Sequence, residues 1–88
     1  MMGLEGGDQM RAFKVILSNQ VYTSMWVLFI RKAYGKTGWK IKGINIQTGA
    51  ETETKCIDAS DLYTAITVWA SVQPDNMNKV TAAGEIKF

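Results

Sequence analysis

The stretch 25–46, MWVLFIRKAYGKTGWKIKGINI, decides the fold, because it predicts two long strands joined by a turn. Apolar residues run without a break over 25–30, and a second alternation of apolar and polar residues begins at Trp39. The turn between them holds Gly35 and Gly38, and glycine adopts the positive φ angles that tight hairpin turns require. The same stretch contains five of the ten basic residues and two of the three tryptophans. The strongest fold signal therefore coincides with the best candidate for a functional surface.

Outward from this hairpin, residue alternation predicts the remaining elements. Phe13, Val15 and Leu17 share one face of an N-terminal strand and are expected in the core. A helix with an apolar stripe is expected before Pro74, with Asp58 as its N-cap. The expected strands are 12–18, 25–33, 39–47, 51–57 at an exposed edge, and 78–88, and the expected helix is 59–73. The expected minimal core is Trp26, Leu28, Ile30, Ile41, Ile44, Leu62, Ile66, Trp69, Val80 and Ile86.

The return strand of the hairpin changes phase along its length. Trp39 and Ile41 share one face, whereas Ile44 and Ile46 are out of phase with them. A β-bulge at Gly43 would insert one extra residue and bring all four apolar side chains onto one buried face. We therefore expect the strand ladder to be interrupted at Gly43.

The order of these elements predicts an α+β fold. A mainly antiparallel sheet of four to five strands, in the order β-β-β-β-α-β, would carry one helix on one face. We expect residues 1–10 to form a flexible leader and residues 11–88 to form a single small domain. The longest apolar run is 25–30, far shorter than the roughly 20 residues of a membrane-spanning helix. No membrane span is predicted.

The residue inventory argues against catalysis. The chain has no histidine, the commonest general base and metal ligand, and Cys56 is its only cysteine. We therefore expect no catalytic residues, no metal site, no cofactor and no enzymatic activity. An unpaired thiol is typical of a reducing, cytoplasmic compartment, and we expect Cys56 to be a small buried hydrophobe.

A first candidate surface follows from the apolar residues that one helix cannot cover. Ile16, Val27 and Phe29 alternate with the core residues of their strands, so they are expected on the uncovered face of the sheet. Such a face needs long neighbouring side chains, a second subunit or a partner. This pattern predicts a protein-interaction module that binds a protein partner or associates with itself.

A second candidate surface follows from the charge distribution, because residues 11–50 carry seven basic residues and no acidic one. Cations contact phosphates and aromatic rings stack on bases, so a basic and aromatic hairpin over 31–42 indicates single-stranded nucleic-acid binding as the alternative function. A soluble, solvated strand face is the simpler interpretation, and the core pattern already claims Trp39. The candidate nucleic-acid-binding residues are Arg31, Lys32, Tyr34, Lys36, Lys40 and Lys42.

In size, lack of catalytic groups and element order, the chain resembles the small accessory proteins carried by bacteriophages and mobile elements, which include anti-defence inhibitors. The resemblance extends over the whole chain and rests on no diagnostic motif. It implies an inhibitor that acts by binding a protein partner. The net charge of +2 argues against acidic mimicry of DNA.

Overall fold

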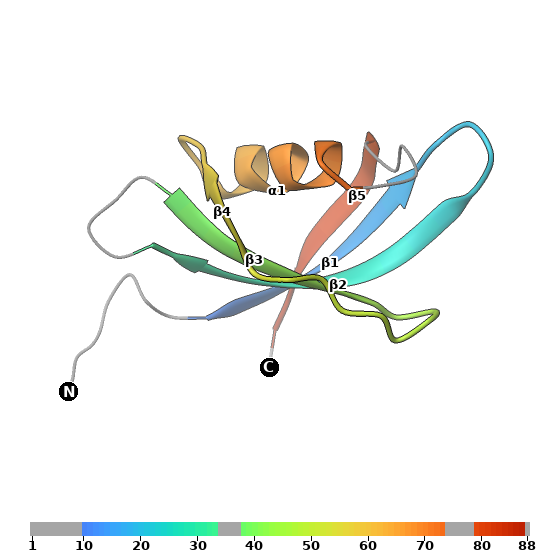
Figure 1. Ribbon diagram of the computed structural model, residues 1–88, viewed down its shortest axis with the longest axis horizontal. Helices are drawn as coiled ribbons and strands as arrows, with labels where there is room; N and C mark the ends of the chain where they lie inside the picture. Colours follow the sequence, from blue (N-terminus) through green and yellow to red (C-terminus); the bar gives the residue numbers. More distant parts are fainter. Residues whose placement is uncertain (1–9, 34–37, 74–78, 88) are drawn as a thin grey trace.

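A computed structural model of the chain, which describes residues 10–33, 38–73 and 79–87, has a five-stranded antiparallel sheet with one helix on one face (Figure 1). The strand order across the sheet is β4-β3-β2-β1-β5. This arrangement confirms the predicted α+β class. The expected flexible leader lies outside the described residues, apart from Met10. The elements are β1 Arg11–Ser18, β2 Thr23–Lys32, β3 Gly38–Asn45, β4 Lys55–Asp58, α1 Leu62–Ser71 and β5 Lys79–Ile86.

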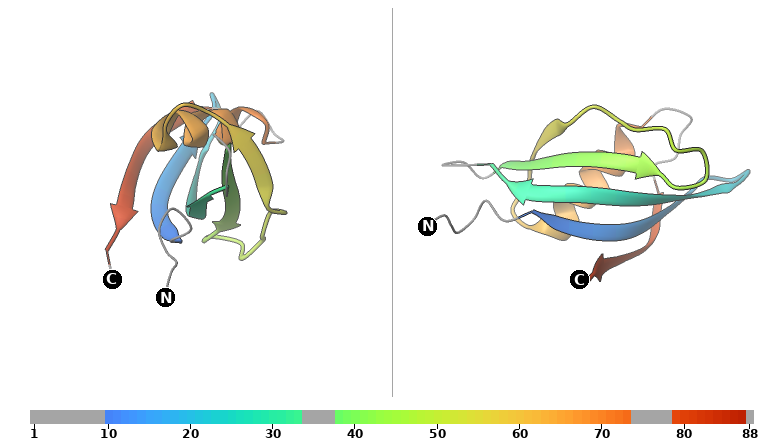
Figure 2. Two further views of the ribbon diagram at one scale, coloured as in Figure 1. Left: turned by 90° about the vertical axis from the view of Figure 1, so that its left-hand side faces the viewer. Right: turned by 90° about the horizontal axis from the view of Figure 1, so that it is seen from below.

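The helix connects the two edges of the sheet. The chain leaves β4 at one edge and returns as β5 at the other, so α1 crosses the strands between them. Seen from below, the strands lie in front of the helix (Figure 2, right). We call the face that α1 does not cover the open face. The candidate site consists of the residues whose side chains point to the open face.

The core lies between α1 and the other face of the sheet. Phe13, Val15 and Leu17 are fully buried there, as their alternation predicts. They meet the apolar stripe of the helix, and Trp69 is the largest fully buried side chain. The Trp26 indole packs edge-to-face on Trp69, with ring centroids 5.5 Å apart. The Trp69 Nε1 atom has no hydrogen-bond partner within the described part of the chain.

The helix begins later than expected, and its N-cap is Asp61 rather than Asp58. The Asp61 Oδ1 atom accepts a hydrogen bond from the backbone N–H of Thr64 at 2.8 Å. Asp58 instead ends β4, where it pairs with Gly38 of β3. Both aspartates precede the apolar stripe of the helix. Asp61 is the N-cap because β4 extends through Asp58, so the helix can begin only after the chain has turned.

The bulge predicted at Gly43 is absent. The ladder between β2 and β3 is regular, with Leu28 opposite Gly43 and Val27 opposite Ile44. Glycine stands here for another reason: a Cβ at Gly43 would lie 2.6 Å from Cζ2 of Trp69. The missing side chain makes room for the indole. Ile44 therefore points to the open face and does not belong to the core.

The register irregularity lies in β5 instead. The β1–β5 register shifts between Ile16 and Leu17, which pair with Ala82 and Val80, so Thr81 is the extra residue. The Thr81 hydroxyl donates to the backbone oxygen of Ile16 at 3.2 Å. Val80 packs against the core, whereas Ile86, expected on the same face, pairs with Ala12 on the open face. Ile86 is thus a second error in the predicted core.

The edge strand β4 is shorter than its expected span of 51–57. Only Lys55–Asp58 form the strand, and an isolated bridge joins Glu51 to Ile44. The intervening chain is tied to β3 through Thr52, whose N–H donates to the Gly43 oxygen at 2.8 Å. Its position at the edge of the sheet agrees with the prediction.

Candidate interaction surface

The open face carries apolar side chains on four neighbouring strands, β3, β2, β1 and β5. Residues directly opposite each other in antiparallel strands share a face. Lys14 pairs with Val27, Ile16 with Met25, Ala12 with Phe29, and Val27 with Ile44. The apolar part of the open face comprises Ala12, Ile16, Met25, Val27, Phe29, Ile44, Ala82 and Ile86.

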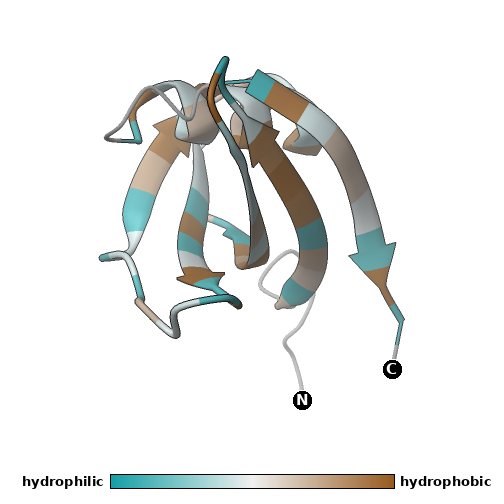
Figure 3. Ribbon diagram, turned by 90° about the vertical axis from the view of Figure 1, so that its right-hand side faces the viewer, coloured by the Kyte–Doolittle hydropathy of each residue, from teal (hydrophilic) through white to brown (hydrophobic). Residues whose placement is uncertain are grey.

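The three residues that sequence alternation assigned to an uncovered face all lie on the open face. Ile16, Val27 and Phe29 are half-buried by their neighbours on adjacent strands. Ala12, which pairs with both Phe29 and Ile86, is only 2 % exposed. Side chains on this face therefore pack on one another and form a coherent layer without a helix above it. Coloured by hydropathy, one strand carries a long apolar run, whereas others alternate between hydrophilic and hydrophobic residues (Figure 3).

The apolar layer extends past the end of β3. The Ile46 N–H donates to the Met25 oxygen at 3.0 Å, which holds Ile46 beside the beginning of β2. Its side chain is 46 % exposed. Sequence reasoning placed Ile44 and Ile46 in the core, and it did not single out Met25. The signal for Ile44 and Ile46 was present in the alternation of β3, once the bulge is removed, and the signal for Met25 was its shared phase with Val27 and Phe29 in β2.

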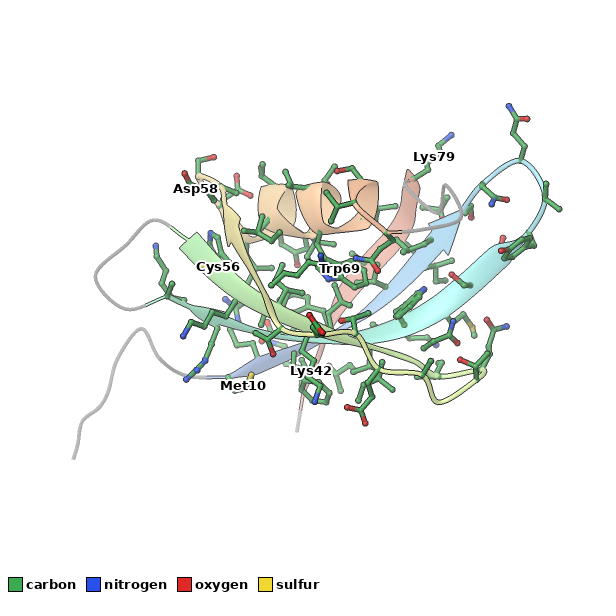
Figure 4. The ribbon with its side chains drawn as sticks, viewed as in Figure 1. Met10, Lys42, Cys56, Asp58, Trp69 and Lys79 are labelled. Atoms are coloured by element: carbon green, nitrogen blue, oxygen red, sulfur yellow. The ribbon has the colours of Figure 1, made fainter. Side chains whose placement is uncertain are left out.

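Cations gather at one end of the open face, near the end of β2 and the beginning of β3. Arg31 lies directly opposite Lys40, and Lys42 lies opposite Phe29. Like charges opposite each other across two strands destabilise a sheet, by about 0.2–1 kcal/mol. Lys42 forms an ion pair with Glu51 at 2.9 Å. Figure 4 shows Lys42 and Trp69 on opposite sides of the sheet.

Lys14 adds a further cation to the open face, between Val27 and Gly84 on the neighbouring strands. Its side chain is exposed. Lys14 was not among the predicted site residues, because it lies far from the hairpin along the chain. The register of β1 against β2 brings the two together.

Lys32 does not belong to this cluster. It lies on the helix side of the sheet, with its Nζ atom 4.8 Å from the centroid of the Trp39 ring. The Trp39 indole N–H donates to the backbone oxygen of Ala59 at 3.1 Å, so Trp39 serves packing, as its alternation predicts. Tyr34 and Lys36 lie outside the described residues. The structure thus brings together three of the candidate nucleic-acid-binding residues, Arg31, Lys40 and Lys42.

Arg11 likewise does not belong to the open face, because it lies opposite the core residue Ile30 on the helix side of the sheet. Its guanidinium contacts the Glu85 carboxylate through two hydrogen bonds of 3.0 Å. The hydrogen bond between the two side chains raises the pKa of Arg11 and lowers the pKa of Glu85. This pair joins β1 to β5. Its charges are matched, unlike those of Arg31 and Lys40.

The remaining polar side chains form no centre of reactive chemistry. Within 10–33, 38–73 and 79–87, no group of three His, Cys, Asp or Glu side chains lies close enough to hold a metal ion. Cys56 is exposed rather than buried, because it lies on the short edge strand opposite Lys40. The expectation that it fills the core is therefore wrong.

Comparisons of the chain with protein-family models, with curated proteins and with solved structures find no match. None of the helices in the described part of the chain is long and apolar enough to cross a membrane. The open face is thus the candidate site that the geometry itself defines.

Proposed function

We propose that this chain is a small non-enzymatic interaction protein that binds a protein partner through the open face. The observation that carries the proposal is the regular ladder at Gly43, which adds Ile44 to Ile16, Val27 and Phe29 on one uncovered face. Extensive apolar surface on one sheet face is typical of a contact surface, because its burial against a partner removes that area from water.

The cations at one end of this face indicate the chemistry of the partner. Arg31 and Lys40 face each other without an acidic partner among the described residues, so an acidic rim on a bound protein would relieve their repulsion. A second copy of the chain on this face would instead bring further cations against them. The proposed partner is therefore a different protein with an apolar patch bordered by Asp or Glu side chains.

Binding of this kind suits an inhibitor, because a small sheet can cover the functional surface of a partner without having catalytic activity. This part of the proposal, including the bacteriophage-accessory role and the cytoplasmic location, rests on the resemblance and on the unpaired Cys56 thiol. The central experiment tests the surface itself.

A displayed library of random peptides, panned on the immobilised protein, tests the open face. We expect enriched peptides that combine apolar residues with Asp or Glu, and we expect Val27→Asp to weaken their binding at least about tenfold, since a new buried carboxylate would face an apolar contact. Val21→Asp is the matched control, because Val21 is 82 % exposed in the loop between β1 and β2. Fluorescence anisotropy with a labelled enriched peptide gives the affinities.

A second variant, at a more exposed position, shows whether weaker peptide binding comes from a lost contact with the peptide or from unfolding of the protein. Ile46→Asp alters a side chain that is already 46 % exposed, so its thermal unfolding should stay close to that of the wild type while peptide binding falls. Equal binding by the wild type, Val27→Asp and Ile46→Asp would overturn the proposal. Enrichment of peptides without acidic residues would overturn its electrostatic part.

Single-stranded nucleic acid is the second candidate ligand, and one observation favours it. Arg31, Lys40 and Lys42 share the open face with Phe29, so cations and one aromatic ring are available together. Phe29 is, however, the one aromatic side chain that the described strands place on this face, and the rest of the layer is aliphatic. Aliphatic side chains pack on proteins better than they stack on bases.

A fluorescent single-stranded oligonucleotide distinguishes the two candidates. A nucleic-acid binder would lose affinity steeply as salt rises, and Arg31→Glu with Lys40→Glu would abolish the binding. The protein-binding proposal predicts little oligonucleotide binding at moderate salt. Tight, salt-sensitive binding that the double variant removes would favour the second candidate.

A further inference from the structure

The outer surface of α1 carries no charge. From Leu62 to Gln73 the sequence LYTAITVWASVQ contains no acidic or basic residue. Tyr63 is 54 % exposed, Val68 is 36 % exposed and Val72, the C-cap, is 51 % exposed. A surface helix ordinarily presents charged and polar residues to water on the side away from the core. The uncharged helix face therefore calls for a physical explanation.

The hydroxyl groups on this face are engaged within the helix itself. The Thr67 hydroxyl donates to the Tyr63 oxygen at 3.1 Å, and the Ser71 hydroxyl donates to the Val68 oxygen at 2.7 Å. The Thr64 hydroxyl lies close enough to the Asp61 carboxylate to help lower its pKa. Side chains of this kind satisfy their donors locally. What the face offers to a partner is largely methyl groups and the Tyr63 ring.

We propose that the outer face of α1 is the contact surface between two copies of this chain, related by a two-fold axis. In such a contact each surface patch meets its own copy, so a patch of one charge sign repels itself. The uncharged helix face has no such repulsion. The open face, with Arg31 opposite Lys40, does have it, which assigns the two surfaces to different partners.

The spacing of the exposed side chains suits packing of one helix on another. Thr64, Val68 and Val72 form a ridge at intervals of four residues, and Thr67 and Ser71 form its neighbour. Ridges of this kind interdigitate when two helices cross, and side chains this small allow a close approach. A ten-residue helix is about 15 Å long. The contact is therefore smaller than a standard interface, and the dimer should be weak and dependent on concentration.

The proposed dimer leaves the proposed partner-binding surface free. Because α1 lies between the sheet and the two-fold axis, both open faces point outward. Each dimer would present two copies of the open face, so a partner with repeated acidic patches would bind with added avidity. The two proposals rest on opposite sides of the molecule, and a variant on one side tests only that side.

Sedimentation velocity over two decades of protein concentration tests the dimer. We expect the mean mass of the wild type to rise toward that of a dimer, and we expect Val68→Asp to weaken self-association about tenfold or more, since it would bury two carboxylates against each other. Val21→Asp, the same substitution at an 82 % exposed loop position, should self-associate like the wild type. Val27→Asp on the open face should do so as well.

Cross-linking gives a second test that does not depend on a charged residue in the helix. In a Cys56→Ser background, Val68→Cys should form a disulfide-linked dimer under mild oxidation, whereas Lys14→Cys should not. A wild type that stays monomeric at all concentrations, together with no Val68→Cys cross-link, would overturn the proposal. So would a dimer that Val68→Asp leaves intact, or a monomer whose helix binds phosphatidylcholine vesicles instead.

Discussion

At the scale of single residues, Gly43 has the most constrained position in the sheet. Gly43→Ala would bring a Cβ to 2.6 Å from Trp69 and to 3.0 Å from Leu28, so the indole or the strand would have to move. We expect the free energy of unfolding to fall by about 1–3 kcal/mol, the usual cost of overpacking a core. Denaturant titration of wild type and variant measures the difference.

Gly84 provides the matched control for this prediction. It also lies within a strand, but a Cβ there would meet nothing within 4 Å. Gly84→Ala should leave the free energy of unfolding unchanged or raise it by about 0.5–1 kcal/mol, because alanine has less conformational freedom to lose. Equal losses at both positions would contradict the role given to Trp69.

Asp61 links one side chain to the acid stability of the helix. The Thr64 backbone N–H, and then the Thr64 hydroxyl, lower the pKa of Asp61 from the ordinary value of 3.8. A carboxyl with a lowered folded pKa stabilises the fold above its unfolded pKa, and that stability is lost as pH falls through the folded pKa. Asp61→Asn keeps the capping oxygen but cannot titrate. We expect its thermal unfolding to match the wild type near neutral pH and to lose less on acidification below pH 3.8.

Asp61→Ala completes this comparison, because it removes the cap at every pH. Its unfolding temperature should fall by about 4–8 °C even at neutral pH. Part of the acid sensitivity should persist in both variants, since the pKa of Glu85 is also lowered, by its hydrogen bond to Arg11. A wild-type acid response in Asp61→Asn would show that the cap does not contribute to it.

At the scale of elements, alternation and helical spacing were enough to predict the fold class and the element order. The helix stripe of Leu62, Ile66 and Trp69 and the alternation of β1 are local patterns, and tertiary packing agrees with them. Element ends were less predictable. Asp58 and Asp61 both suit an N-cap, and the choice between them depends on how far β4 continues to pair with β3.

The two faults in the predicted core have one physical cause. The cause is pairing and packing between segments that are far apart in the chain. In β3 the change of phase means either a bulge or apolar residues on both faces, and local sequence does not distinguish these cases. At Gly43 the deciding contact comes from Trp69 on the helix, far along the chain. In β5 the alternation looks regular, yet the pairing with β1 places a bulge at Thr81. Both outcomes depend on partners that become neighbours only in the folded sheet.

At the scale of the whole molecule, the candidate site was predicted in part. Ile16, Val27 and Phe29 share the open face because strand alternation fixes their side relative to the core. The same alternation also sorts the cations of β2, because Lys32 is in phase with Leu28 and Ile30 and so belongs to the helix side, whereas grouping the cations by their place in the hairpin put Lys32 in the wrong set. Lys14 joins the site only through the pairing of β1 with β2. Sheet register, rather than proximity along the chain, assembles the surface.

The like-charge pair of Arg31 and Lys40 leads to a prediction about stability. If these cations are retained for a partner, the free protein bears their repulsion, and Lys40→Thr should raise its free energy of unfolding by about 0.2–1 kcal/mol. The gain should shrink at high salt, which screens the repulsion. Denaturant titrations of wild type and variant at low and high salt measure both effects.

Lys42→Thr is the control for this charge effect. It also removes a cation from β3, but it breaks the 2.9 Å ion pair with Glu51, so no gain in stability is expected. Lys40→Thr should also bind peptides selected on the open face more weakly, although the free protein is more stable. The Lys40 charge attracts the acidic residues of the partner, but it repels Arg31 in the free protein. Lys40→Thr could instead be less stable than the wild type at both salt concentrations. That result would indicate that the aliphatic stem of Lys40 stabilises the sheet by packing, and it would contradict the like-charge argument for an acidic partner.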